Sequence, residues 1–323
     1  MNFWQIILIV CAALLVLITF AAVIEMKIFI EPKSIWANLI ANIKINPKPT
    51  SCEQLASYEN AKKAKEEASL WLAQEDWEDK NIVSFDNLNL HAKIHMAKEQ
   101  SHNWVICIHG YSGTICHSAT YGIKYFEKGF NVVLPEARCH GESQGKYIGM
   151  GWLERYDILY WIEEIIKRDT NANIVLHGES MGAATVMMVT GENLPVQVKC
   201  AVEDCGYSAV WNQFTYNKKC ILKIKNPPMM AYISLLAKIF AHYDFKSASS
   251  VNQLKKSKTP TLFIHGEDDK FVPFSDLDLC YEAASCPKDK YTVPYAGHCQ
   301  SEYVDVEKYW QKVFEFVNKF LHS

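Results

Sequence analysis

The chain has 323 residues, of which 49% are apolar and 21% are charged. This length and composition suit one large folded domain or two smaller ones, and they exclude a chain that is disordered throughout. Lysine and arginine total 33 against 36 acidic residues, which gives a net charge of −3 with no basic block. We therefore expect no nucleic-acid partner.

The N-terminal segment is the first candidate element. Residues 2–24 carry no charged side chain and read NFWQIILIVCAALLVLITFAAVI. As a helix they can span ~30 Å of hydrocarbon. A signal peptide would have a shorter apolar run after a basic region, and a buried core helix would not be apolar on every face. We predict a transmembrane anchor over residues 1–25.

The lysines and cysteines suggest where the rest of the chain lies. Four lysines follow the anchor, at Lys27, Lys33, Lys44 and Lys48, so the positive-inside rule places the C-terminal bulk of the chain in the cytoplasm. Cysteine occurs 11 times without a C-x-x-C pair, which fits a reducing compartment and no structural zinc site. We expect Cys200 and Cys205, the closest pair, to pack in the core.

The next segments change from helical to alternating patterns. Residues 26–80 predict a connector and an amphipathic helix, the helix at about 51–79. A β-hairpin is expected from Ile82–Phe85 and Leu88–Met96. Further strands are expected at Trp104–Ile108, Asn131–Leu134, Ile174–Leu176, Val198–Val202, Thr261–Ile264 and Tyr291–Val293, with helices such as Tyr156–Lys167 and Met181–Thr190 between most of them. The alternation predicts an α/β domain over residues 81–323, with a mostly parallel central sheet and helices on both faces.

One interval breaks this alternation. From Tyr207 to about Val251 no strand is expected, but Met229–Tyr243 forms an apolar helical segment. An insertion after a strand's carboxyl end lies where α/β sheets place their ligand crevice. We interpret residues 207–251 as a helical cap. Its apolar side chains either line a pocket for an apolar acyl or aryl group or simply pack on the sheet.

A G-x-S-x-G pattern, Gly178–Gly182, stands between an expected strand and an expected helix. In that context the pattern predicts a sharp turn that exposes Ser180 Oγ at the carboxyl edge of the sheet. The two glycines leave room for the strand and the helix to approach closely. A serine hydroxyl needs a base, usually a histidine held by a carboxylate.

Two later loops contain candidate partners for this serine. A strand ending at His265 is followed by Glu267, Asp268 and Asp269, and another strand is followed by Gly297 and His298. The chain order Ser180, Asp269, His298 is typical of this sheet topology. Asp268 is a rival of Asp269, and Glu267 is a weaker one.

The remaining histidines at strand ends or in loops, His109, His140, His177 and His265, are interpreted as structural or rim residues. Backbone N–H groups of Tyr111, in a Gly-bearing loop after an early strand, and of Met181, which starts a helix, are candidates for an oxyanion hole.

Together these segments resemble the α/β-hydrolase superfamily over roughly residues 81–321. The resemblance looks closest to bacterial membrane-anchored or membrane-adjacent serine hydrolases with esterase-like and prolyl-oligopeptidase-like relatives. The matching segments are His109-Gly110, Arg138–Ser143, Gly178–Gly182, His265-Gly266 with Asp269 and Val272-Pro273, and Gly297-His298. The resemblance implies the α/β-hydrolase fold, with Ser180 as nucleophile, Asp269 as acid and His298 as base. One departure lies in Glu136–Gly141, where many relatives have Asp before the arginine and Gly after it.

We therefore expect a serine hydrolase that acts on a small-molecule carboxylic ester through an acyl-enzyme, with no metal or organic cofactor. Peptide or amide cleavage by the same residues is the first alternative. A membrane-tethered binding module without catalysis is the second, although all three triad positions are filled. The membrane, through the N-terminal helix, is the other expected partner.

Overall fold

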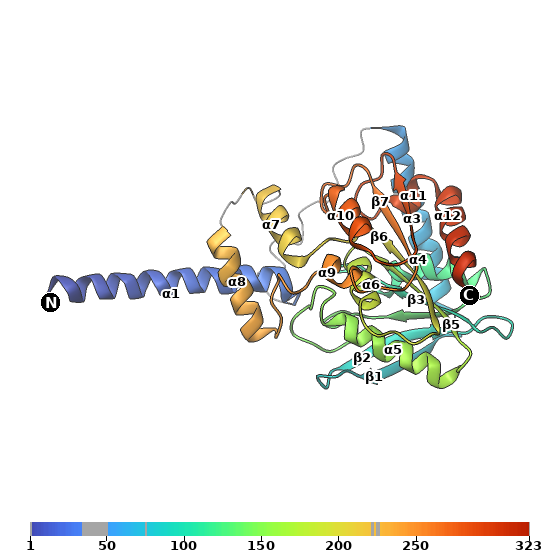
Figure 1. The fold of residues 1–323 in the computed structure, drawn as a ribbon, viewed down its shortest axis with the longest axis horizontal. Helices are drawn as coiled ribbons and strands as arrows, with labels where there is room; N and C mark the ends of the chain where they lie inside the picture. Colours follow the sequence, from blue (N-terminus) through green and yellow to red (C-terminus); the bar gives the residue numbers. More distant parts are fainter. Residues whose placement is uncertain (1, 34–50, 75, 221–222, 224–226, 323) are drawn as a thin grey trace.

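A computed structural model describes residues 2–33, 51–74, 76–220, 223 and 227–322. At its centre lies one sheet of eight strands in the order β1-β2-β4-β3-β5-β6-β7-β8 (Figure 1). The strands are β1 (Glu78–Val83), β2 (Asn89–His95), β3 (Asn103–Ile108), β4 (Asn131–Pro135), β5 (Asn173–Glu179), β6 (Val198–Asp204), β7 (Thr261–Gly266) and β8 (Lys288–Val293). β2 pairs antiparallel with β1 and with β4, and the other pairs are parallel. The expected mostly parallel sheet with a hairpin at one edge is confirmed.

Helices cover both faces of this sheet. They are α3 (Cys52–Leu72), α4 (Ile115–Phe126), α5 (Glu154–Arg168), α6 (Met181–Thr190), α10 (Ser275–Ala283), α11 (Ser301–Val304) and α12 (Val306–Phe320). Successive side chains of a strand point to opposite faces. In β3, Val105 and Cys107 therefore join the core under α3, α4 and α12. Trp104 and Ile106 join the core under α5 and α6.

Several boundaries differ from the sequence prediction, and two of them lie at the edges of the sheet. The helix expected over residues 51–79 ends at Leu72, and β1 starts at Glu78. β8 starts at Lys288 rather than at Tyr291. Both differences fall on edge strands whose side chains are mostly exposed or half-buried. Backbone pairing with one neighbour holds such a strand in place, and that pairing leaves no apolar pattern in the sequence.

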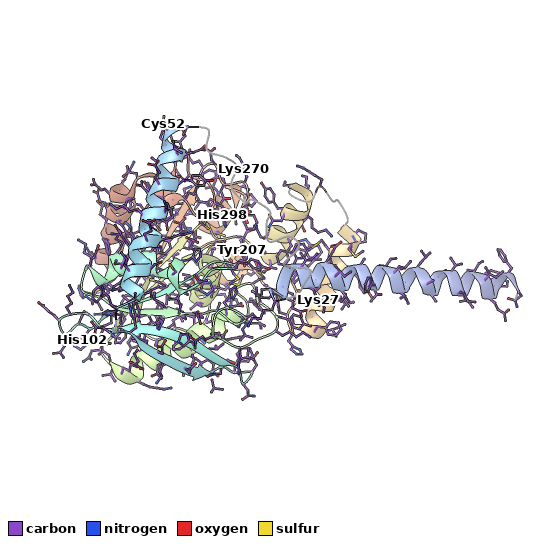
Figure 2. The ribbon with its side chains drawn as sticks, turned by 180° about the vertical axis from the view of Figure 1, so that it is seen from behind. Lys27, Cys52, His102, Tyr207, Lys270 and His298 are labelled. Carbon is purple, nitrogen blue, oxygen red and sulfur yellow. The ribbon has the colours of Figure 1, made fainter. Side chains whose placement is uncertain are left out.

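Three helices occupy the interval that the sequence predicts to be a cap. They are α7 (Val210–Cys220), α8 (Pro227–Phe240) and α9 (Ser250–Leu254), and they lie between β6 and β7. We keep the name cap for residues 207–251. α1 (Phe3–Ile30) crosses α8, while its N-terminal part projects far from the domain (Figure 1). Lys27 marks the region where α1 meets the domain in Figure 2.

The C-terminal part of α1 is built into the protein. Its buried residues are Ala22, Met26 and Ile30, and they share an apolar core with the cap. Thr19 Oγ1 lies 2.8 Å from the Tyr232 hydroxyl of α8, and Glu25 forms an ion pair with Lys218 of α7. The helix thus continues beyond the predicted anchor, residues 1–25. Residues 34–50 of the predicted connector, with Lys44 and Lys48, lie outside the described residues.

α1 is also the one helix, among those the structure describes, that is long and apolar enough to cross a membrane.

Candidate active site

Ser180 lies at a sharp turn between β5 and α6. Its φ of 56° and ψ of −114° fall in a region that residues with a side chain rarely adopt. A Cβ on Gly178 would lie 2.3 Å from the Gly182 carbonyl oxygen, and a Cβ on Gly182 would lie 2.0 Å from that of Ile108. Neither position therefore tolerates a side chain, as the motif predicts.

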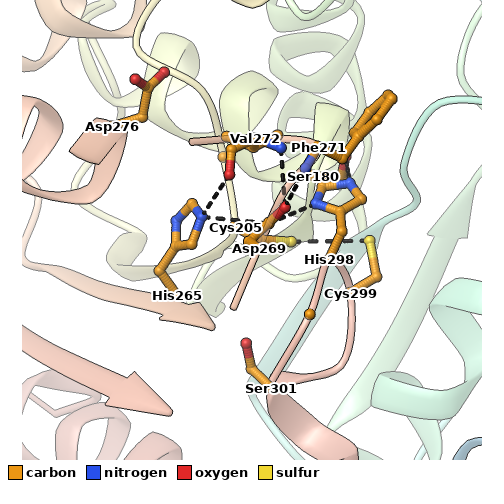
Figure 3. Close-up of polar contacts among 12 residues, drawn as sticks. Ser180, Cys205, His265, Asp269, Phe271, Val272, Asp276, His298, Cys299 and Ser301 are labelled. Carbon is orange, nitrogen blue, oxygen red and sulfur yellow. Dashed lines mark hydrogen bonds and ion pairs between the residues drawn. The ribbon is translucent and has the colours of Figure 1, made fainter. Parts of the chain in front are cut away.

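Ser180, His298 and Asp269 form a continuous chain of hydrogen bonds (Figure 3). Ser180 Oγ lies 2.8 Å from His298 Nε2, and His298 Nδ1 lies 2.8 Å from Asp269 Oδ2. All three side chains are buried. They follow β5, β8 and β7, whose carboxyl ends lie along one edge of the sheet because these strands are parallel. The structure thus brings together the three residues that the chain order suggested.

Asp269 has partners on both carboxylate oxygens. Oδ1 accepts hydrogen bonds from the N–H groups of Phe271 and Val272, at 2.8 and 2.9 Å. Oδ2 also lies 3.3 Å from His265 Nε2. Burial by itself would raise the pKa of Asp269, but His298 and His265 beside it hold that pKa well below its usual range. The carboxylate therefore stays ionised.

The two rival acids make other contacts. Asp268 Oδ2 accepts a hydrogen bond from Gln54 of α3 at 3.2 Å, and Glu267 is exposed. Of the three neighbouring acids, Asp269 is the one that contacts His298. Burial opposes protonation of His298, but the Asp269 carboxylate raises the pKa of His298 well above its ordinary value. The carboxylate thus stabilises the imidazolium that forms when His298 takes the serine proton.

Two backbone N–H groups lie beside the serine. Met181 is the first residue of α6, so its N–H has no acceptor within the helix. Tyr111 follows Gly110, and a Cβ on Gly110 would lie 3.3 Å from Ser180 Cβ, so the loop after β3 lies against the serine. Among the residues that the structure describes, neither N–H donates to a backbone carbonyl. Among those residues, neither N–H therefore has a backbone acceptor that would compete with an oxygen bound next to Ser180.

Comparisons with known proteins agree with this fold. The family model for serine aminopeptidase, S33, matches residues 99–226. The uncharacterized protein YqkD of Bacillus subtilis is 28% identical over 226 residues, which cover 69% of this chain and 74% of YqkD. Esterase Pf2001 of Pyrococcus furiosus has a TM-score of 0.61 at 22% identity, covering 76% of this chain and 93% of its own. Est1E of Butyrivibrio proteoclasticus, solved with ferulic acid, has a TM-score of 0.57 at 18% identity, covering 74% and 99%.

The chain therefore has the fold of the α/β-hydrolases.

Three other histidines of this chain have structural partners. His109 Nε2 and His140 Nε2 each accept a backbone N–H, and these bonds join the loops after β3 and β4. His177 lies between two tyrosine hydroxyls in the core. These contacts agree with their interpretation as structural residues.

The loop that departs from the α/β-hydrolase pattern, Glu136–Gly141, is held by ion pairs. Arg138 is buried and bonds to Asp157 at 2.7 Å and to Asp86 at 2.9 Å. Glu136, where many relatives have an aspartate, accepts the N–H of Glu142 at 2.6 Å. The departure therefore serves the loop's own structure, and neither residue contacts Ser180.

An apolar core begins directly after Ser180. Met181 belongs to the same core as Phe214 of the cap and Met26 of α1, and Tyr111 packs against that core. The Tyr111 hydroxyl also donates to the Ile28 carbonyl of α1, at 3.5 Å. The N-terminal helix and the cap thus form one apolar body next to the serine.

Three residues near the triad were not anticipated from the sequence as site residues. His265 contacts Asp269, although it was interpreted as structural or rim. Cys205 is buried as expected, but its Sγ lies 3.8 Å from Cys299 Sγ, whereas Cys200 is buried within β6. No spacing rule connects Cys205 with Cys299. The one signal in the sequence is that Cys299 directly follows His298.

Proposed function

We propose that this α/β-hydrolase is a serine hydrolase that cleaves carboxylic esters through an acyl-enzyme. The observation that carries the proposal is the hydrogen-bond chain from Ser180 Oγ through His298 to Asp269, with both distances at 2.8 Å. A serine, a histidine and a carboxylate in this arrangement have what nucleophilic catalysis requires.

Each residue then has a defined step. Ser180 Oγ attacks the acyl carbon while His298 Nε2 takes its proton. Asp269 stays ionised and stabilises the imidazolium. The oxyanion accepts hydrogen bonds from the N–H groups of Met181 and Tyr111, and loss of one such donor typically costs ~10²–10³ in rate. His298 returns the proton to the leaving alcohol, then activates the water that releases the acyl group.

The apolar core beside Ser180 supports an ester with an apolar acyl or aryl group as the substrate. The esterases among the similar structures support the same reaction type. Peptide or amide cleavage is the second candidate, and it is favoured by the description of the matching family as a serine aminopeptidase. An amide needs a well-placed acid for its leaving amine, which an ester does not.

We also propose that α1 anchors the domain in the cell membrane, with the domain on the cytoplasmic side. The length and apolar surface of α1 support the anchor. Lys27 and Lys33, at its C-terminal end, support the orientation.

Ser180→Ala tests the reaction. We expect the full-length variant in detergent to lose turnover of a short p-nitrophenyl ester by at least ~10⁴-fold, because no other group replaces the nucleophile. Labelling by a fluorophosphonate probe should disappear as well. Ser118→Ala is the matched control, since Ser118 is also buried but its hydroxyl bonds only to the Ile115 carbonyl in α4. Full labelling of Ser180→Ala would contradict the assignment.

A panel of esters and aminoacyl amides separates the candidate reactions. Faster turnover of p-nitrophenyl and aryl esters favours the esterase, and faster turnover of aminoacyl amides favours the peptidase. If the wild-type protein is folded but neither turns over any substrate nor reacts with the probe, the domain is a binding module.

A further inference from the structure

Two thiols lie beside the proposed general base. Cys205 directly follows β6, and Cys299 directly follows His298 in the loop after β8. The two sulfur atoms lie 3.8 Å apart, and the contact is drawn in Figure 3. Both cysteines adopt left-handed backbone conformations, with φ of 53° and 57°. Such values are uncommon for cysteine, so the fold holds both residues in place at some cost.

The two thiols and the imidazole of His298 lie close enough together to share one metal ion. One ligand atom each from Cys205, Cys299 and His298 can be chosen so that all three lie within 4.8 Å of one another. Zinc–thiolate bonds of ~2.3 Å at tetrahedral angles separate two sulfur ligands by about 3.8 Å. The observed separation of the two sulfur atoms is 3.8 Å. The thiols are thus already spaced as a zinc ion would require.

The ligand atoms of this cluster favour some metal ions over others. Two thiolates and an imidazole form a soft donor set, which favours Zn²⁺ over the oxygen-preferring Mg²⁺ and Ca²⁺. Cys205 is fully buried, whereas Cys299 is only half-buried. Three protein ligands leave the fourth tetrahedral position for a water molecule.

We infer that Cys205, Cys299 and His298 form a binding site for a thiophilic divalent cation such as Zn²⁺, and that the bound metal reversibly switches off the hydrolase. Binding forms two metal–sulfur bonds and one metal–nitrogen bond, and it releases the two thiol protons to solvent.

The inhibition follows from the bonds that His298 already makes. Its Nε2 is engaged with Ser180 Oγ, and its Nδ1 is engaged with Asp269. A metal on Nε2 removes the acceptor for the serine proton. A metal on Nδ1 displaces the carboxylate that orients the ring. Either way the triad is interrupted, and removal of the metal restores it.

Metal binding is tested without reference to activity. Full-length protein, reduced with a phosphine and kept anaerobic, is titrated with Zn²⁺ against a chromophoric chelator. Co²⁺ is used in parallel to detect thiolate-to-cobalt absorption. We expect one tight Zn²⁺ per chain with a thiolate signal, and no competition from Mg²⁺. Cys299→Ser and Cys205→Ser should each weaken binding by ~10-fold or more. Cys116→Ser, at another half-buried cysteine, should bind like the wild type.

The proposal that the bound metal switches off the enzyme rests on the proposed hydrolase function. Inhibition of p-nitrophenyl ester turnover by the metal measures it. Zn²⁺ should inhibit the wild type and Cys116→Ser at equal concentrations, with recovery by a chelator, and should inhibit Cys299→Ser only at higher concentration. Equal Zn²⁺ affinity in Cys299→Ser and wild type, or no tight binding by the wild type, overturns the site. If the protein binds Zn²⁺ tightly and Cys299→Ser weakens that binding, but the wild type turns over no ester, the metal site is supported and the proposed hydrolase function is refuted.

Discussion

Both carboxylate oxygens of Asp269 have bonding partners in this structure. Two backbone N–H groups fix Oδ1, and two histidines share Oδ2. His265 thereby becomes a positioning residue for the carboxylate, although it does not contact Ser180. A carboxylate fixed in this way can hold the His298 ring in one orientation and one tautomer, which is what proton transfer from Ser180 requires.

Asp269→Asn tests that role at the level of one residue. We expect kcat for a p-nitrophenyl ester to fall by roughly 10³–10⁴-fold, because the neutral amide neither stabilises the imidazolium nor holds the right tautomer. Asp268→Asn is the matched control and should retain activity, since Asp268 bonds to Gln54 instead. Equal losses in the two variants would refute the assignment of Asp269 as the acid.

At the scale of single elements, α11 shows how a short helix can bury a carboxyl group. Glu302 is 2% exposed, and its Oε1 accepts the indole N–H of Trp310 in α12 at 3.0 Å. Oε2 has no hydrogen-bond partner in the part of the chain that the structure describes. Burial raises the pKa of Glu302 from 4.5 to about 7. The folded protein therefore binds this proton more tightly than the unfolded chain does.

This raised pKa of Glu302 makes the stability of the folded protein depend on pH. The stability contributed by the protonated Glu302 is fully present below about pH 4.5 and is lost as the pH rises through about 7. We expect Glu302→Gln to remove this loss, so that the difference in unfolding free energy between variant and wild type shifts in the variant's favour from pH 4.5 to 8. The shift is at most about 3 kcal/mol. Urea unfolding at both pH values measures it, with exposed Glu163→Gln as the control. A pH-independent difference would contradict the buried, protonated state.

At the scale of the whole molecule, α1 and the cap are one structural unit. The exposed part of α1 is suited to a membrane, but Ala22, Met26 and Ile30 are buried against the cap. The same apolar core includes Met181, directly after Ser180. Substitutions of the buried residues at the C-terminal end of α1 should therefore affect the region around Ser180. Substitutions in the projecting part of α1 should not.

Met26→Ala tests this coupling. Met26 is 1% exposed, so its loss leaves a cavity and should lower the unfolding free energy by about 2–5 kcal/mol in detergent. Leu15→Ala, at a position 61% exposed, removes a comparable side chain and should leave stability in detergent unchanged. Thermal unfolding followed by tryptophan fluorescence compares the two. Equal stability of both variants would mean that α1 is only a tether.

Local patterns in the sequence were sufficient to predict the mostly parallel sheet, its edge hairpin and the turn at Ser180. Period-two and helical spacings, and glycines where backbones must approach, act over a few residues. The polar edge strands β1 and β8 were placed less accurately, because backbone pairing holds them.

Contacts between distant segments required the tertiary structure. The order of the sheet places the ends of β5, β6, β7 and β8 side by side. That arrangement brings the loop that carries Asp269 to His298, and it brings Cys205 to Cys299, which lies 94 positions away. It is also only in three dimensions that the end of α1 meets the cap, because apolar burial has no direction along the chain and is set by whichever surfaces the fold brings together.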